Sequence, residues 1–263
     1  MQYMILRRAD RRSETGRLAP PEDSLLFASL QPSANAVRLR LRDGEASVTP
    51  GPFPDPAEMI AGFAIVDVPD KNAAIDWLRA WPAEEQPVEL EIRESGCPGG
   101  CAQVVPTEVA GLENHKRFAV LLRSSDDLEN EVPVPQAMLD ALDVHNAAEA
   151  KAGVLLAADG LRGSARGARV KVAKHSFSVI DGPFTEIKEM IAGFWLIRAP
   201  SMEDAIAWAK RNPYPVGSNV DVEIRAVFDS AATVNAFPPD QQAAEQHIRA
   251  EQLEAGMRAH FTA

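Results

Sequence analysis

The sequence predicts an α+β fold in which two ferredoxin-like units pack sheet to sheet as an intramolecular pseudo-dimer, with an additional C-terminal helix. Three observations predict it. A long segment of the chain occurs twice, each copy mixes β-type and helix-type patterns, and each predicted sheet has one face that its own helices leave uncovered. At 263 residues the chain is long for one compact domain and suits two.

The repeat is clearest in a motif of thirteen residues. Gly51–Phe63 reads GPFPDPAEMIAGF and Gly182–Phe194 reads GPFTEIKEMIAGF, so that nine of the thirteen residues are identical at a spacing of 131. Beyond the motif, AAIDWLRA (73–80) matches DAIAWAKR (204–211), and VELEIRE (88–94) matches VDVEIRA (220–226). Self-similarity of this extent predicts a first unit at residues 1–110 and a second unit at 115–230.

The elements of the second unit follow from its local patterns. FAVLLRS (118–124) and AGVLLAA (152–158) are β-type runs, ARVKVAK and SFSVI alternate as two strands around a turn, and AGFWLIRA (192–199) and VDVEIRAVF are further strands. A helix is predicted between Pro135 and Gly153, residues typical of a helix start and end. A second helix is predicted at 201–211, with Ser201 as N-cap and Asp204 at N3.

The first unit is an incomplete copy. Tyr3 to Gly51 spans 48 positions and Phe118 to Gly182 spans 64, so 16 residues are absent, about four helical turns at 1.5 Å per residue. The polar, proline-interrupted stretch RADRRSETGRLAPPED stands where the first helix is expected. Because a sheet face without its helix exposes apolar area, we expect the C-terminal stretch 238–261 to form a helix that docks there. The alternative is a mobile tail.

Composition limits the classes of function. The net charge of −11 argues against nucleic-acid binding, which needs clustered Lys and Arg, but leaves a small ligand open. The N-terminal apolar run is too short for a signal peptide, and no window approaches a membrane span, so a cytoplasmic location is expected. The expected partners therefore exclude nucleic acid and membrane, and the chain is expected to be a monomeric pseudo-dimer or a homodimer.

Metal and cofactor chemistry finds little support in the motifs. The two cysteines, Cys97 and Cys101, lie in the turn-like SGCPGGC and cannot complete a four-ligand zinc site alone. Two reduced thiols in a turn are the preferred interpretation, and a redox switch or a metal shared between chains is the alternative. The sequence has no phosphate-binding glycine loop, no Ser-His-Asp signature and no metal-ligand cluster, so no cofactor and no metal are predicted.

The second unit resembles the YCII-related family, and more narrowly its branch named for an Asp-Gly-Pro-Phe motif. The motif is DGPF at 181–184, and EMIAGFWLI, AGVLLAADGL (152–161) and GARVKV (167–172) are also similar to this branch. The resemblance implies a dimeric α+β barrel. It implies little about activity: an acidic residue and a histidine in a cleft are suspected to act in the family, one relative is a dehydrochlorinase, and members encoded beside sigma factors hint at regulation.

Asp181 is the first candidate catalytic residue. It lies between a β-type run and a Gly-Pro turn, so its carboxylate is displayed from a stiff edge, and apolar neighbours would raise its pKa and suit it to proton transfer. The alternative is a turn residue that hydrogen-bonds to nearby N–H groups. Pro50 replaces it in the first unit. His145 is the second candidate, as an acid–base partner for Asp181 if it faces the sheet, and a half-exposed helix residue otherwise.

Other polar and aromatic residues are interpreted as structural. Glu58 and Glu189 occur in both copies and are expected to brace the motif loop, and His175 is expected in an exposed turn. Phe194 and Trp195 alternate along a strand, so one should line the interface between sheets and the other should meet the helices.

The sequence thus predicts a small-molecule protein whose second unit alone keeps a competent site. If it is an enzyme, lyase or isomerase chemistry with Asp181 as base fits best. The alternative is a non-catalytic binding or regulatory module.

Overall fold

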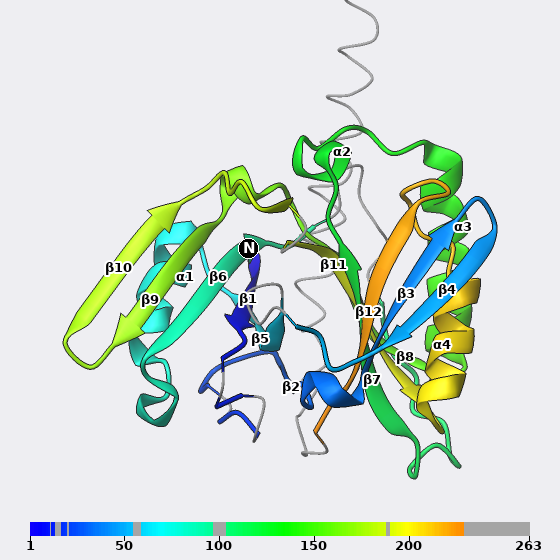
Figure 1. The fold of residues 1–263 in the computed structure, drawn as a ribbon, viewed down its shortest axis with the longest axis horizontal. Helices are drawn as coiled ribbons and strands as arrows, with labels where there is room; N and C mark the ends of the chain where they lie inside the picture. The colour runs from blue at the N-terminus through cyan, green and yellow to red at the C-terminus, as the bar shows by residue number, and fades with distance from the viewer. Residues whose placement is uncertain are drawn as a thin grey trace, which may run out of the picture.

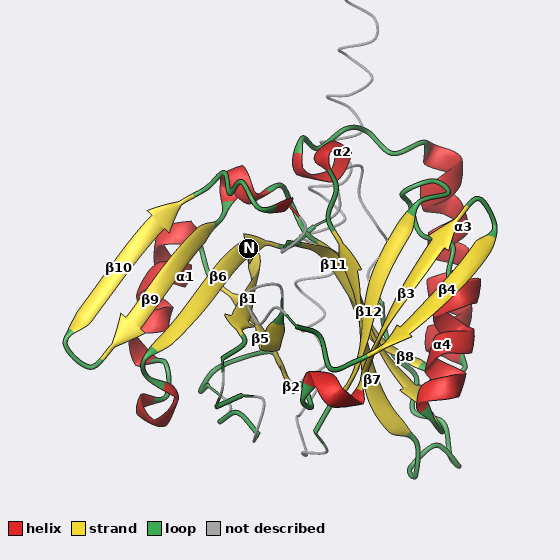
Figure 2. Ribbon diagram, viewed as in Figure 1, coloured by secondary structure: helices red, strands yellow, loops and turns green. Residues whose placement is uncertain are grey.

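The computed structural model describes residues 1–10, 12–13, 17–19, 21–54, 59–96, 104–187 and 190–228. These residues form two antiparallel six-stranded sheets with few helices, which confirms the α+β class (Figure 2). No helix among them is long and apolar enough to cross a membrane. The predicted C-terminal helix at 238–261 lies outside the described residues.

The first sheet contains all the strands of the first unit except one hairpin. Its order is β10 (Ser176–Asp181), β9 (Ala168–Ala173), β6 (Val88–Glu94), β1 (Gln2–Arg8), β5 (Ile60–Asp67) and β2 (Leu26–Ser29). One α-helix, α1 (Lys71–Trp77), packs on it and continues into the 3₁₀ turns η3 (Leu78–Ala80) and η4 (Ala83–Glu85). Asp70 caps α1 by accepting a hydrogen bond from the backbone N–H of Ala73.

The second sheet is built in the same way from the second unit. Its order is β4 (Glu45–Pro50), β3 (Ala36–Arg42), β12 (Val220–Ala226), β7 (Lys116–Arg123), β11 (Ile191–Ala199) and β8 (Leu155–Gly160). Its helices are α2 (Asp126–Glu129), α3 (Gln136–Lys151) and α4 (Met202–Arg211). The predicted helix between Pro135 and Gly153 is confirmed as α3, and Ser201 caps α4 as predicted, accepting from the N–H of Asp204 at 3.2 Å.

Each unit contributes one hairpin to the other unit's sheet. The hairpin β3–β4 of the first unit pairs with β12, and the hairpin β9–β10 of the second unit pairs with β6 (Figure 1). The alternation of ARVKVAK and SFSVI predicts two strands, as observed, but it does not reveal which sheet they join, because a period of two residues defines a strand and not its partner. The exchange links the two units through backbone hydrogen bonds.

The two sheets pack face to face through an apolar core, and the helices lie on the outer faces. The rings of Phe63 in β5 and Phe194 in β11 meet at the centre of this core, 5.0 Å apart. Trp195, the next residue, packs in the cluster under α3 and α4. The expected division of Phe194 and Trp195 between sheet interface and helices is therefore confirmed.

The first unit has no helix among its described residues between β1 and β2. Leu18, from the polar stretch that replaces the helix, is buried in the cluster that includes Tyr3, Trp81 and Phe27. The polar stretch therefore supplies an anchoring side chain of its own to the sheet face.

Candidate functional site

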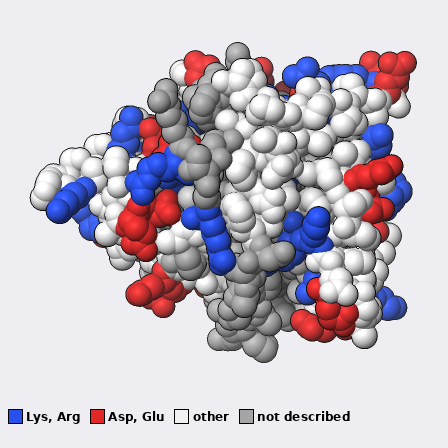
Figure 3. Space-filling model, turned by 60° about the horizontal axis from the view of Figure 1, so that its bottom comes forward, with Lys and Arg blue, Asp and Glu red and all other residues white. Residues whose placement is uncertain are grey.

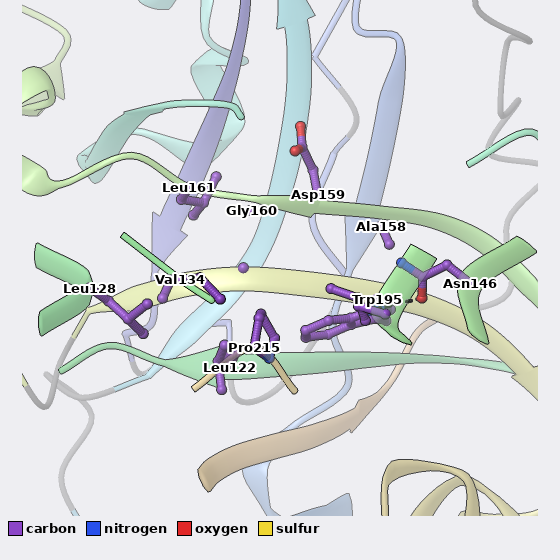
Figure 4. A pocket seen from close by; sticks show the side chains of 13 residues that line it. Leu122, Leu128, Val134, Asn146, Ala158, Asp159, Gly160, Leu161, Trp195 and Pro215 are labelled. Carbon is purple, nitrogen blue, oxygen red and sulfur yellow. Dashed lines mark hydrogen bonds between the residues drawn. The ribbon is translucent and has the colours of Figure 1, made fainter. Parts of the chain in front are cut away.

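A cavity of about 50 Å³ lies on the outer face of the second sheet, beneath α2 and α3. Its walls are mostly apolar and come from both helices and from the three adjacent strands β7, β11 and β8. The side chains that enclose it include Leu122, Leu128, Val134, Leu142, Ala158 and Trp195 (Figure 4). A concave, mainly apolar site with few polar groups is the usual form of a small-molecule pocket.

The main polar side chain in this wall is Asn146 on α3. It is 5% exposed, and its Oδ1 accepts a hydrogen bond from Nε1 of Trp195 at 3.2 Å. Asp159 also lines the cavity, but Figure 4 shows its carboxylate pointing away from Trp195. The strand register explains this, since Asp159 lies opposite Phe194, whose side chain faces the other sheet. Asp159 therefore borders the cavity with its backbone.

The equivalent place in the first unit is filled. Strand register aligns Ala158 with Phe27, because they lie opposite Trp195 and Ala64, which correspond in the repeat. Phe27 is buried. Leu18 fills the remaining space beside Gly62, because a Cβ atom added to Gly62 would lie 2.8 Å from Cδ1 of Leu18.

The cavity wall of the second unit and the equivalent positions of the first unit also differ in charge. Arg7 of β1 corresponds to Leu122 of β7, since they lie opposite the equivalent residues Gly62 and Gly193. The Arg7 side chain is buried and pairs with Glu85 at 3.3 Å. A guanidinium and its carboxylate thus occupy space that the second unit leaves open.

The Gly-Pro-Phe turns have the same geometry in both units. A Cβ atom on Gly51 would lie 1.8 Å from the carbonyl oxygen of Ser33, and one on Gly182 would lie 1.9 Å from that of Ser164, so only glycine fits. Each following phenylalanine lies under an arginine, Phe53 under Arg38 at 4.1 Å and Phe184 under Arg169 at 4.3 Å. These are cation–π contacts, and the duplicated motif is a packing element in both copies.

The stacked arginines belong to two equivalent clusters of buried charge. Arg38 reaches Glu223 of β12, and Arg169 reaches Glu91 of β6, so each links an exchanged hairpin to the neighbouring strand of the sheet that it joins. Each glutamate is 1% exposed and also pairs with arginines of its own sheet, Glu91 with Arg8 and Arg93, and Glu223 with Arg123 and Arg225.

Burial alone would raise the pKa of Glu223, but Arg123 and Arg225 outweigh it and hold the pKa below its ordinary value. The carboxylate is therefore charged in the folded protein at neutral pH. These clusters fasten the exchanged hairpins to the sheets that they complete.

Glu129 connects this charge network to the cavity wall. Its carboxylate accepts hydrogen bonds from the backbone N–H of Ser164 at 2.7 Å and from Arg93 at 3.0 Å. Burial would raise the pKa of Glu129, and the charge of Arg93 and the hydroxyl of Ser124 lower it overall. Because Glu129 ends α2, these bonds hold the short helix whose Leu128 closes one side of the cavity.

Asp181 lies at the end of β10, the outermost strand of the first sheet. Its side chain is 69% exposed, and its carboxylate pairs with Nζ of Lys71 on α1 at 2.7 Å. The pair joins the two units, since Lys71 belongs to the first. Asp181 does not border the cavity under α3.

Comparison with known proteins identifies the family. The model of the YCII-related domain matches the chain twice, at residues 1–94 and 117–229. The chain belongs to the YCII-related domain family. The two matched segments are consistent with a tandem duplication, and together they cover more than half of the chain. No curated protein matched the sequence.

His145 is on α3 of the second YCII-related domain, far from Asp181. Its ring packs 5.6 Å from that of Trp208 on α4, and its Nε2 is buried without a hydrogen-bond partner among the described residues. Desolvation lowers the pKa of His145, with Glu149 acting in the opposite direction. Figure 1 shows α3 and β10 at opposite ends of the molecule, so the structure does not bring Asp181 and His145 together.

Sequence reasoning missed Asn146, although a signal was present. The buried positions of α3 are 139, 142, 146 and 150, and Asn146 is the one polar residue among them. A polar residue within the apolar stripe of a helix needs a hydrogen-bond partner, and this indicates a special role. The loop residues Glu58 and Glu189, and the cysteines Cys97 and Cys101, lie outside the described residues.

Proposed function

We propose that this YCII-related protein binds a small molecule in the cavity beneath α3, and that only its second unit keeps the site. The supporting observation is the contrast between the open cavity beside Ala158 and the equivalent place in the first unit, where Phe27 and Leu18 are packed. A protein that needed both faces only for stability would gain from filling both, because voids lose packing contacts.

The proposal includes the architecture that creates the site. The strand orders β6-β1-β5-β2 and β12-β7-β11-β8 are equivalent, which supports two ferredoxin-like units related as a pseudo-dimer. The DGPF motif at 181–184 supports membership of the branch named for it. We also propose a cytoplasmic location, and a chain that acts as a monomeric pseudo-dimer or a homodimer without nucleic-acid or membrane partners. The surface in Figure 3 carries basic and acidic side chains interspersed.

In the enzymatic form of the proposal, the chemistry is of the lyase or isomerase type, and Asp181 transfers the proton. The motif that carries Asp181 supports this role, but Asp181 lies outside the cavity and His145, on α3 at the opposite end of the molecule, does not serve as its partner. In the alternative form, the protein is a non-catalytic binding or regulatory module, of the kind that the family resemblance connects with sigma-factor regulation. The ion pair of Asp181 with Lys71 favours the alternative, because it gives the carboxylate a structural contact.

Thermal-shift screening against a metabolite library tests the proposal. A ligand at 100 times its Kd stabilises the native state by about 2.7 kcal/mol. Ala158→Phe introduces the residue of the first unit and should abolish the shift, whereas Ala147→Phe, on the exposed side of α3, should preserve it. A ligand that stabilises the Ala158→Phe variant as much as the wild type would contradict the proposed site.

Asp181→Asn separates the two forms once a ligand is known. If Asp181 is a catalytic base, this variant should bind the ligand normally and lose about 100-fold or more in kcat. Unchanged turnover would remove Asp181 from the mechanism. A ligand that is bound but never converted favours the binding module.

A further inference from the structure

The chemistry of the cavity wall limits the class of ligand that it accepts. Among the described residues that line it, Asp159 carries the only ionisable side chain, and its carboxylate points away from Trp195 (Figure 4). A charged group inserted here would lose its hydration without gaining an opposite charge from these residues. Burying an unpaired charge is strongly unfavourable.

Asn146 offers one donor group, its amide N–H₂, to a ligand. The indole N–H of Trp195 can only donate, so the atom of Asn146 that it meets must be the carbonyl oxygen. The amide nitrogen is therefore the other atom, and it has no hydrogen-bond partner among the described residues. Figure 4 shows this nitrogen beside Ala158. A buried amide N–H₂ held in one orientation selects an acceptor on the ligand.

The size of the cavity limits the enclosed part of the ligand. The volume is about 50 Å³. An engineered apolar cavity of about 150 Å³ encloses benzene. The enclosed group is therefore smaller than an aromatic ring, comparable with a short acyl or branched alkyl group, and any larger part of the ligand remains outside.

We infer that the ligand of this site is an uncharged carbonyl compound, such as a ketone, ester or amide, whose short apolar group enters the cavity while its oxygen accepts a hydrogen bond from Nδ2 of Asn146. The inference rests on the proposed function and adds the substrate class to it. It excludes free carboxylates and phosphates as the inserted group.

Three small probes test this inference by ¹H–¹⁵N chemical-shift titration of the full chain. The ketone 3-methyl-2-butanone has the inferred chemistry, isobutyrate has nearly the same shape with a negative charge, and xenon fills an apolar cavity without accepting a hydrogen bond. The ketone should shift the amides of residues around the cavity and bind at least about ten-fold more tightly than isobutyrate, because the anion lacks a partner there.

Two variants isolate the amide donor. Trp195→Phe removes the indole N–H, which would become a free donor once Asn146 is replaced, so that the amide of Asn146, no longer oriented by Trp195, is the remaining side-chain donor in the wall. Replacing Asn146 by Leu in this background should weaken ketone binding about five-fold, the effect of one hydrogen bond, and leave xenon binding unchanged. Xenon thus controls for damage to the cavity itself.

The outcomes separate the inference from the proposed function. Equal binding of ketone and isobutyrate, or a ketone affinity that does not depend on Asn146, overturns the inferred ligand class while the site stands. If none of the three probes perturbs the residues around the cavity, the cavity admits no small molecule, and the proposed function fails together with the inference.

Discussion

The two units place different residues at equivalent positions of the same framework. In the second unit Leu122 and Ala158 border a cavity, and in the first Arg7 and Phe27 occupy the corresponding positions. Leu18 fills what remains. The described residues of the first unit include no counterpart of the helix that roofs the cavity in the second, and its sheet face is covered by large side chains and by the ion pair of Arg7 with Glu85.

The framework itself is the same in both units. The two Gly-Pro-Phe turns, the arginines stacked on their phenylalanines and the buried glutamates Glu91 and Glu223 correspond one to one. The difference teaches that residues retained in both copies report on packing, whereas residues found in one copy mark where the units diverged. Asn146 and Asp181 are of the second kind.

The largest expected effect tests the equivalence of the two charge clusters. Glu223→Gln leaves the buried Arg225 and the half-buried Arg38 and Arg123 without their shared carboxylate, and should lower the free energy of unfolding by about 3–5 kcal/mol, as removal of one partner from a buried ion pair does. Glu91→Gln should cost a similar amount. Urea denaturation at pH 7 measures both, with Glu203→Gln on the exposed face of α4 as the control, expected within about 0.5 kcal/mol of the wild type.

The pH dependence of stability checks the same cluster. Because the pKa of Glu223 is lower in the folded protein than its ordinary value of 4.5, its contribution is fully present above pH 4.5 and is lost as the pH falls through the folded-state pKa. Glu223→Gln should therefore flatten the acid limb of the stability curve. Unequal losses in Glu91→Gln and Glu223→Gln would show that the clusters, although alike in geometry, differ in energetic role.

How well a feature of the fold can be predicted from the sequence depends on whether local or long-range interactions determine it. Helix α3 and the N-cap Ser201 follow from local spacing and capping, so the sequence predicts them well. The exchange of hairpins depends on long-range pairing between Arg169 and Glu91, and on backbone bonds that strand alternation does not specify. The sequence therefore predicts the strands of the hairpin and misses their sheet.

The sequence does not predict the cavity either. It depends on the volumes of side chains that come into contact only in the folded protein, such as Leu18 beside Gly62. The hydrophobic periodicity of the sequence does not predict such contacts. The prediction for the site therefore centred on Asp181, a residue that its motif makes conspicuous. Asn146 has no motif, and its importance follows from its burial and its bond to Trp195.

A second prediction concerns the filled position in the first unit. Phe27→Ala removes a buried ring and should lower the free energy of unfolding by about 3 kcal/mol, through lost burial and the void that remains. Filling the cavity with Ala158→Leu adds a short branched alkyl group, of the size that about 50 Å³ admits, so its cost should be less than half of that. Urea denaturation compares them, and equal costs would contradict the view that one place is filled and the other open.

The smallest expected effect bears on why the second unit has an aspartate where the first has Pro50. The pair of Asp181 with Lys71 is solvent-exposed on the aspartate side, so its coupling free energy in a double-mutant cycle of Asp181→Asn and Lys71→Met should be below about 0.5 kcal/mol. A value above about 1.5 kcal/mol would mean that the carboxylate fastens the exchanged hairpin to α1 and has a structural reason to be there. With a small coupling that reason disappears, because Pro50 already shows that the turn forms without a carboxylate. The turnover of Asp181→Asn on an identified ligand is then the measurement that decides whether the carboxylate transfers a proton.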